Sequence, residues 1–112
     1  MPKTIRATES YRESLLADLK DPLEAAHYLD ASIRDDDPGV FLLALRDVAE
    51  AHGGLRTLSS QTRLNRENLY RMLSRSGNPS LTSLAAILNA LGLRVTVQPA
   101  VSQTKPRRRR TA

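Results

Sequence analysis

The feature that most constrains the fold of this chain is a pair of short helix-forming segments, residues 55–62 and 66–75, separated by a tight turn. The second segment has the sequence RENLYRMLSR. Its apolar residues Met72 and Leu73 follow Leu69 by three and four positions, so one side of a helix is predicted to be buried. Asn65 precedes this helix and is a favourable N-cap. The polar residues at the helix start are then left exposed, and neither short helix can form a core without further helices.

Three further helices are predicted from capping residues followed by apolar spacing. Asp21, Asp37 and Ser80 are expected to cap helices over residues 22–33, 38–51 and 81–91. The helix over 38–51 has the widest apolar face and is expected to be the central one. Residues 11–20 are predicted to form only a short amphipathic segment. Residues 93–98, LRVTVQ, alternate apolar and polar side chains and predict one short strand. The predicted fold class is therefore all-α, a five-helix domain with a C-terminal β-strand.

The helix over residues 22–33 carries an apolar set of its own. Leu23, Ala26, Leu29 and Ile33 are spaced to lie on one side of this helix. We expect all of them to form one buried stripe against the central helix.

Length and composition set the domain limits. The chain has 112 residues and 40% hydrophobic residues, which suffices for one small domain over residues 11–98. Residues 1–10 are expected to be flexible, and residues 99–112, which end in KPRRRR, to be a disordered basic tail. There is no Cys and no apolar run long enough to span a membrane. A cytoplasmic protein without a membrane partner is expected.

The charge is divided unequally along the chain. Residues 1–53 carry six basic and eleven acidic residues, a net −5. Residues 54–98 carry six arginines against Glu67 alone, and residues 99–112 carry five basic residues and no acid, a net +5 in each segment. The basic part contains the candidate helix pair and favours a polyanionic partner, whereas the acidic part favours either solvent or a basic partner.

Catalysis and cofactor binding are not expected. His27 and His52 have no neighbouring ligand residues in the sequence, and no residue set offers a nucleophile, a base and an orienting group together. We therefore expect neither an enzyme nor a metal or cofactor site.

Residues 58–97, beginning LSSQTRLNRENLYRMLSRSGNPS and ending with LGL and the short predicted strand, resemble the lambda-repressor-like (Xre-type) helix-turn-helix. The form is that of small HigA-like antidote proteins of toxin–antitoxin modules, and the resemblance extends upstream to cover residues 11–98. It makes residues 55–75 the DNA-reading unit. Arg63 stands where members of this family usually have glycine, so it must adopt a left-handed conformation or shift the turn.

The resemblance also implies DNA-contacting residues. Base contacts are expected from Asn65, Arg66, Glu67, Asn68 and Arg71, and phosphate contacts from Arg56, Thr57, Arg63, Arg75, Ser76 and Asn78. The chemistry agrees, because arginine can bind guanine O6 and N7 with two hydrogen bonds, glutamate can accept from cytosine N4, and asparagine suits adenine. The alternative for the reading helix is a solvated face on which Glu67 pairs with Arg71.

Two partners besides operator DNA are expected. The resemblance implies a RelE/HigB-like toxin, whose candidate contacts beside the acidic residues are Tyr11, Leu15, Leu19, Tyr28 and Asp30. A homodimer is expected because LRVTVQ has no strand to pair with in its own chain. The expected function is thus an antitoxin that neutralises the toxin and represses its own operon.

Two other functions stay open at this point. One is a stand-alone repressor whose N-terminal half is only scaffold, and the other is a nucleic-acid packaging or RNA-binding protein that relies on KPRRRR. The tail itself can serve as a DNA arm, an RNA-binding segment or a solubilising end.

Overall fold

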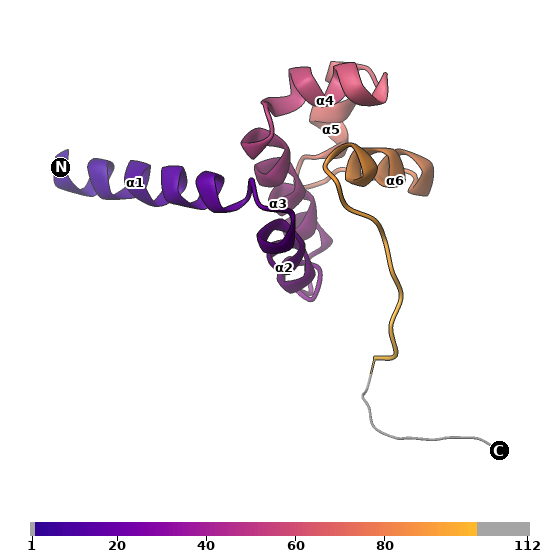
Figure 1. Ribbon diagram of the computed structural model, residues 1–112, viewed down its shortest axis with the longest axis horizontal. Helices are drawn as coiled ribbons and strands as arrows, with labels where there is room; N and C mark the ends of the chain where they lie inside the picture. The colour runs from indigo at the N-terminus through magenta and orange to yellow at the C-terminus, as the bar shows by residue number, and fades with distance from the viewer. Residues whose placement is uncertain (1, 101–112) are drawn as a thin grey trace.

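The computed structural model describes residues 2–100, and in that range the chain forms six helices (Figure 1). In chain order they are α1 (Pro2–Asp18), α2 (Pro22–Ser32), α3 (Pro38–Ala51), α4 (Gly54–Thr62), α5 (Arg66–Met72) and α6 (Leu81–Ala90). The all-α prediction is confirmed for these residues. None of the helices within residues 2–100 is both long enough and apolar enough to cross a bilayer.

The helix starts follow the capping residues. Side-chain oxygens of Asp21, Asp37, Asn65 and Ser80 each accept a backbone N–H from the first turn of the helix that follows, at 2.7–3.2 Å. Such a cap contributes about 1 kcal/mol because it satisfies a donor that the helix itself leaves unpaired. The predicted starts of α2, α3, α5 and α6 are confirmed.

Helix α3 is the centre of the fold, as predicted. It packs against α1, α2 and α4, while α4 also packs against α5 and α6. The core is built from leucine, isoleucine, valine and alanine side chains that lie on the helices or directly after them. These buried residues are Leu19, Ala25, Leu29, Leu42, Ala44, Leu45, Val48, Ala49, Leu58, Leu69, Leu73, Ile87, Leu88 and Leu91. Helix α5 is therefore fixed to the rest of the domain through α4.

The apolar stripe predicted for α2 is wrong in part. Ala25 and Leu29 are buried, but Leu23 is 62% exposed and Ile33, which caps the helix, is 59% exposed. The helix is rotated so that Ala25, Tyr28 and Leu29 face α3, where the Tyr28 hydroxyl donates a hydrogen bond of 2.7 Å to Asp47. Two large apolar side chains are consequently left in solvent.

Helix α1 is longer than the short segment that was expected. It begins at Pro2, where a flexible start had been expected over residues 1–10, and it projects from the body of the domain (Figure 1). Its C-terminal part is held to α3 by Arg12, which lies 2.9 Å from the Asp47 carboxylate and 2.8 Å from that of Glu50. The C-terminal part of α1 is thus attached by these charged contacts and by Leu15, which packs against the core, and the apolar pattern did not predict the charged contacts.

The predicted strand over residues 93–98 is absent from the described chain. These residues are extended, and the hydrogen bond from Leu93 N to Leu88 O, 2.8 Å, is the last backbone bond before they leave α6. A strand exists only with a partner, and no other extended segment in residues 2–100 lies alongside this one. Residues 101–112, with most of the predicted basic tail, lie outside the described residues.

Candidate functional site

The turn between α4 and α5 contains one residue in the left-handed region. Arg63 has φ 66° and ψ 15°, which is the first of the two alternatives that the resemblance left open, a left-handed residue or a shifted turn. Two side chains of α4 fix the turn: the Ser59 hydroxyl donates to the carbonyl of Leu64 at 2.6 Å, and the Thr62 hydroxyl accepts from the Leu64 amide at 3.1 Å. The small side chains of α4 therefore determine the angle at which α5 leaves.

Arg63→Gly is expected to raise the free energy of unfolding by about 0.5–1 kcal/mol, because glycine avoids the cost of about 1–2 kcal/mol that other residues meet in this conformation but loses more chain entropy on folding. Urea denaturation followed by circular dichroism measures the change. The matched control is Arg56→Gly, which removes the same charge from the exposed side of α4, where backbone angles are helical. This control should lower stability by about 0.5–1 kcal/mol, and a loss of stability at both positions would contradict the expectation.

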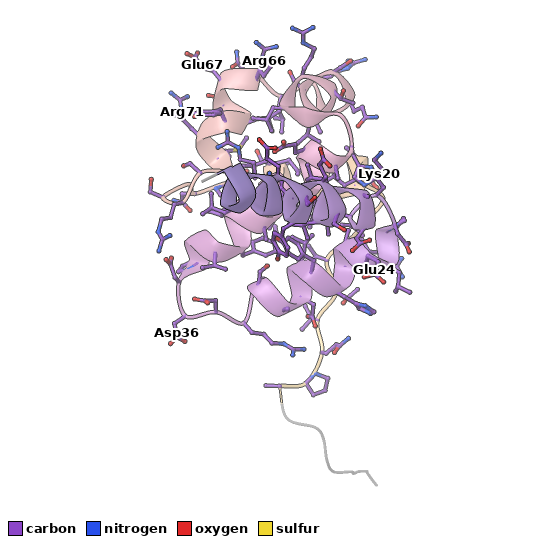
Figure 2. The ribbon with its side chains drawn as sticks, turned by 90° about the vertical axis from the view of Figure 1, so that its left-hand side faces the viewer. Lys20, Glu24, Asp36, Arg66, Glu67 and Arg71 are labelled. Carbon is purple, nitrogen blue, oxygen red and sulfur yellow. The ribbon has the colours of Figure 1, made fainter. Side chains whose placement is uncertain are left out.

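One side of helix α5 is buried in the core, and the other side is exposed to solvent. Leu69 and Leu73 are fully buried, whereas Arg66, Glu67 and Arg71 are exposed. Figure 2 shows these three side chains at one end of the molecule, pointing outward, with Asp36 at the opposite end. The residues predicted to read bases thus lie on the accessible side of a well-anchored helix.

Hydrogen bonds assign different roles to the two asparagines of α5. The Asn65 side-chain oxygen accepts the amides of Glu67 and Asn68, at 2.7 and 3.2 Å, so it is engaged in the cap. The Asn68 side-chain oxygen instead accepts from the guanidinium of Arg71. The Glu67–Arg71 pair, the alternative for a merely solvated face, is not formed among the described ion pairs. Asn68 orients Arg71, and Glu67 is left available.

A shallow cleft brings together residues that were predicted separately. Asn68 and Arg71 of α5 line it with Ser76 and Asn78 of the following loop and Ser83 of α6. Two predicted base-reading residues and two predicted phosphate-contacting residues therefore surround one depression. Arg66 and Glu67 line a second depression with Leu55 and Tyr70. Arg56 and Thr57, at the start of α4, line neither, and the Thr57 hydroxyl donates to the carbonyl of Gly53 at 3.1 Å.

Arg75 occupies a position that the sequence did not predict. Its guanidinium lies 2.6 Å from the carboxylate of Asp37, which also caps α3. The backbone of residue 75 passes so close to Gly39 that an added Cβ there would lie 2.3 Å from its carbonyl oxygen. The loop after α5 is thus pinned to the start of α3, and Arg75 serves this contact in addition to any phosphate contact.

Arg46 of α3 was missed by the sequence reasoning. Its guanidinium lies over the ring of Tyr70 of α5, 4.4 Å from the centroid, in a cation–π contact. No local pattern predicts this pair, because the two residues are 24 positions apart and come together only when α3 and α5 pack around α4. The contact adds a basic side chain beside the exposed side of α5.

The candidate toxin contacts differ in how far they are exposed. Tyr11 is exposed, Leu15 and Tyr28 are half-buried, and Asp30 is exposed and pairs with Arg34 at 2.8 Å. Leu19 is 2% exposed and packs in the core, so its inclusion among the surface contacts is wrong. Its position at the end of the predicted segment did not distinguish a buried anchor from a surface residue.

Burial, and then the hydrogen bond to Asp47, raise the pKa of Tyr28 to about 12. Because the pKa in the folded state lies above the usual value near 10, the contribution of Tyr28 to stability is complete below pH 10 and is lost as the pH rises towards 12. Absorbance titration of the tyrosinates should show that Tyr28→Phe removes the component with the highest midpoint. Removal of a component near pH 10 would contradict this assignment.

Metal binding finds no support among the described residues, where no three His, Cys, Asp or Glu side chains gather closely enough to hold an ion. The site consists instead of exposed Arg, Asn and Ser side chains around α5, and acidic side chains on α1–α3. A model of the family described as "Probable addiction module antidote protein" matches residues 11–99, which is most of the chain and includes all of this site. The chain belongs to this antidote family. An addiction-module antidote is an antitoxin, so a toxin is the kind of partner that the family implies.

One curated relative of the antidote is an uncharacterized protein of Haemophilus influenzae (strain Rd). The two are 32% identical over 71 residues, which cover 63% of this chain and 72% of the relative. No solved structure is significantly similar to the antidote.

Proposed function

We propose that the antidote binds operator DNA through α5, represses its own operon as a homodimer, and neutralises a RelE/HigB-like toxin. The observation that carries the DNA-binding part is the cleft at which Asn68, Arg71, Ser76 and Asn78 meet. Base-reading and phosphate-binding side chains must lie within reach of one groove and its backbone, and the gathering of these four around one cleft supports this arrangement. The short helix with an exposed polar start, anchored by buried leucines, has the form of a major-groove reader.

The separation of charge supports two partners on different faces. The arginines of α4 and α5 lie in the part of the chain with net charge +5, and the acidic residues of α1–α3 in the part with net charge −5. DNA attracts the first, and a basic toxin is attracted by the second. The two partners can therefore be bound at once.

On the acidic side, the contact residues that support this proposal are Tyr11 and Asp30, which are exposed, with half-buried Leu15 and Tyr28 behind them. Leu19 is omitted because it is buried. The projecting helix α1 offers an accessible surface that a toxin can contact from more than one side (Figure 1).

Co-expression of the antidote with the product of the neighbouring reading frame tests this function. The proposal expects that the neighbour alone arrests growth, that the antidote restores growth, and that the two proteins copurify. A neighbour without toxicity, together with specific binding to DNA upstream of the operon, would instead support a stand-alone repressor. Copurification that persists after Tyr11→Ala and Asp30→Ala in combination would move the toxin contact to another surface.

A further inference from the structure

A groove with mainly apolar walls runs between α2 and the extended residues 93–98. Leu23 and Ile33 form its outer wall on α2, and Leu29, Phe41 and Leu88 are among the residues beneath. Its volume is about 430 Å³. Since Leu23 and Ile33 are each more than half exposed, α2 leaves apolar surface uncovered on the same side.

The opposite wall of the groove is a segment that has the composition of a strand but lacks a strand partner. Val95 is 51% exposed and Val97 is 93% exposed. The backbone hydrogen bonds recorded for the described residues include none to residues 94–98. An extended segment with β-branched side chains and free N–H and C=O groups is a template for another strand.

We propose that residues 93–98 of a second copy of this chain occupy the groove, antiparallel to the first segment. The inference rests on the homodimer proposed above and specifies its interface. The same surface of each chain carries the extended segment and the groove that receives it, so a two-fold axis lets the segment of each copy enter the groove of the other. Arg94 and Asp30 both line the groove, so a second copy adds an Arg94 to a groove that already carries a carboxylate.

The alternation of side chains selects the register of the pair. With Val95 on the two-fold axis, Leu93 of each copy lies opposite Val97 of the other copy. All apolar side chains of the two segments then lie on one face of the pair. A shift by one residue would place valines opposite polar residues. In this register Val97, the most exposed of the large apolar side chains, packs near Leu93 and Leu88 at the base of the groove.

Single cysteines test the register directly, because the full chain has no cysteine of its own. Val95→Cys places two thiols across the axis, within the roughly 4.5–5.5 Å between Cα atoms that directly opposed residues show and that a disulfide requires. In Val97→Cys the two thiols are offset by four residues, about 13 Å along the strands. We expect mild oxidation to cross-link Val95→Cys at least tenfold faster than Val97→Cys. Equal rates, or no cross-link in either, would overturn the proposed pairing.

The role of the apolar groove wall on α2 is tested by placing a charged side chain in it. In sedimentation velocity without DNA, the wild-type chain is expected to be a dimer, and Ile33→Asp to weaken the dimer at least tenfold. Leu81→Asp is the matched control, since Leu81 is a 73% exposed leucine that does not line the groove, and it should leave the dimer unchanged. Equal weakening by both variants would overturn the role of the groove.

A failure of the proposed dimer interface can be distinguished from a failure of the proposed DNA-binding function. A wild-type chain that is monomeric at every concentration tested overturns the interface, even if DNA preference still depends on α5. A dimer with the predicted cross-link supports the interface, even if that dimer shows no preference for operator DNA.

Discussion

Replacing Arg71 or Arg66 with alanine is expected to reduce sharply the preference of the antidote for its operator over other DNA, while salt-sensitive binding to any duplex remains. A two-bond contact from arginine to guanine discriminates against the wrong base by about 1–3 kcal/mol, which corresponds to roughly 5- to 150-fold in affinity. Non-specific binding persists because the other arginines of α4 and α5 still attract phosphate. Fluorescence anisotropy with operator and scrambled duplexes measures both affinities.

Arg34→Ala is the control for these variants. It removes the same charge from an exposed arginine of the acidic half, whose partner is Asp30. It should leave the ratio between operator and scrambled affinities unchanged. Should Arg66→Ala and Arg71→Ala weaken binding to every duplex equally, the two arginines would be phosphate contacts and not readers.

Leu69→Ala is expected to lower the free energy of unfolding by about 2–5 kcal/mol. The Leu69 side chain is fully buried between α5 and the core, and its truncation leaves a cavity there. A domain of this size has a total stability of only about 5–15 kcal/mol, so this loss is a large share of it. Urea denaturation monitored by circular dichroism measures the loss.

Leu81→Ala provides the comparison, because the Leu81 side chain is exposed at the start of α6. A change within about 0.5 kcal/mol is expected there. Similar losses at residues 69 and 81 would mean that Leu69 does not anchor α5.

The helix starts could be predicted because their causes are local. A side chain such as Asn65 or Ser80 caps the residues that immediately follow it, so the sequence contains both partners of each contact. The left-handed turn at Arg63 was one of two alternatives, because the family resemblance identified the position as one that usually holds glycine but did not exclude a shifted turn.

Long-range contacts could not be predicted. Arg75 reaches Asp37 across 38 positions, and Arg12 reaches Asp47 across 35, through packing that no periodicity encodes. A long-range contact also explains why the predicted buried stripe of α2 is wrong in part. Two sides of that helix carry apolar residues, and the hydrogen bond from Tyr28 to Asp47 favours the orientation that leaves Leu23 and Ile33 exposed.

The candidate site was predicted in its residue types more than in its geometry. Arg66, Glu67 and Arg71 are exposed as expected, but the pairing of Asn68 with Arg71 and the cap made by Asn65 depend on side-chain positions. The composition of residues 93–98 predicts a strand, and such a segment forms one only when a second segment supplies the hydrogen bonds.

The ratio of affinities for DNA from upstream of the antidote gene and for a scrambled duplex, at physiological salt, tests the central claim most directly. It should be measured for the full chain and for a chain that ends at residue 98. We predict a ratio of at least about 10³ for both chains, because specificity lies in α5 and not in the basic tail. A ratio near one for the full chain, or complete loss of binding on removal of residues 99–112, would contradict operator recognition by α5.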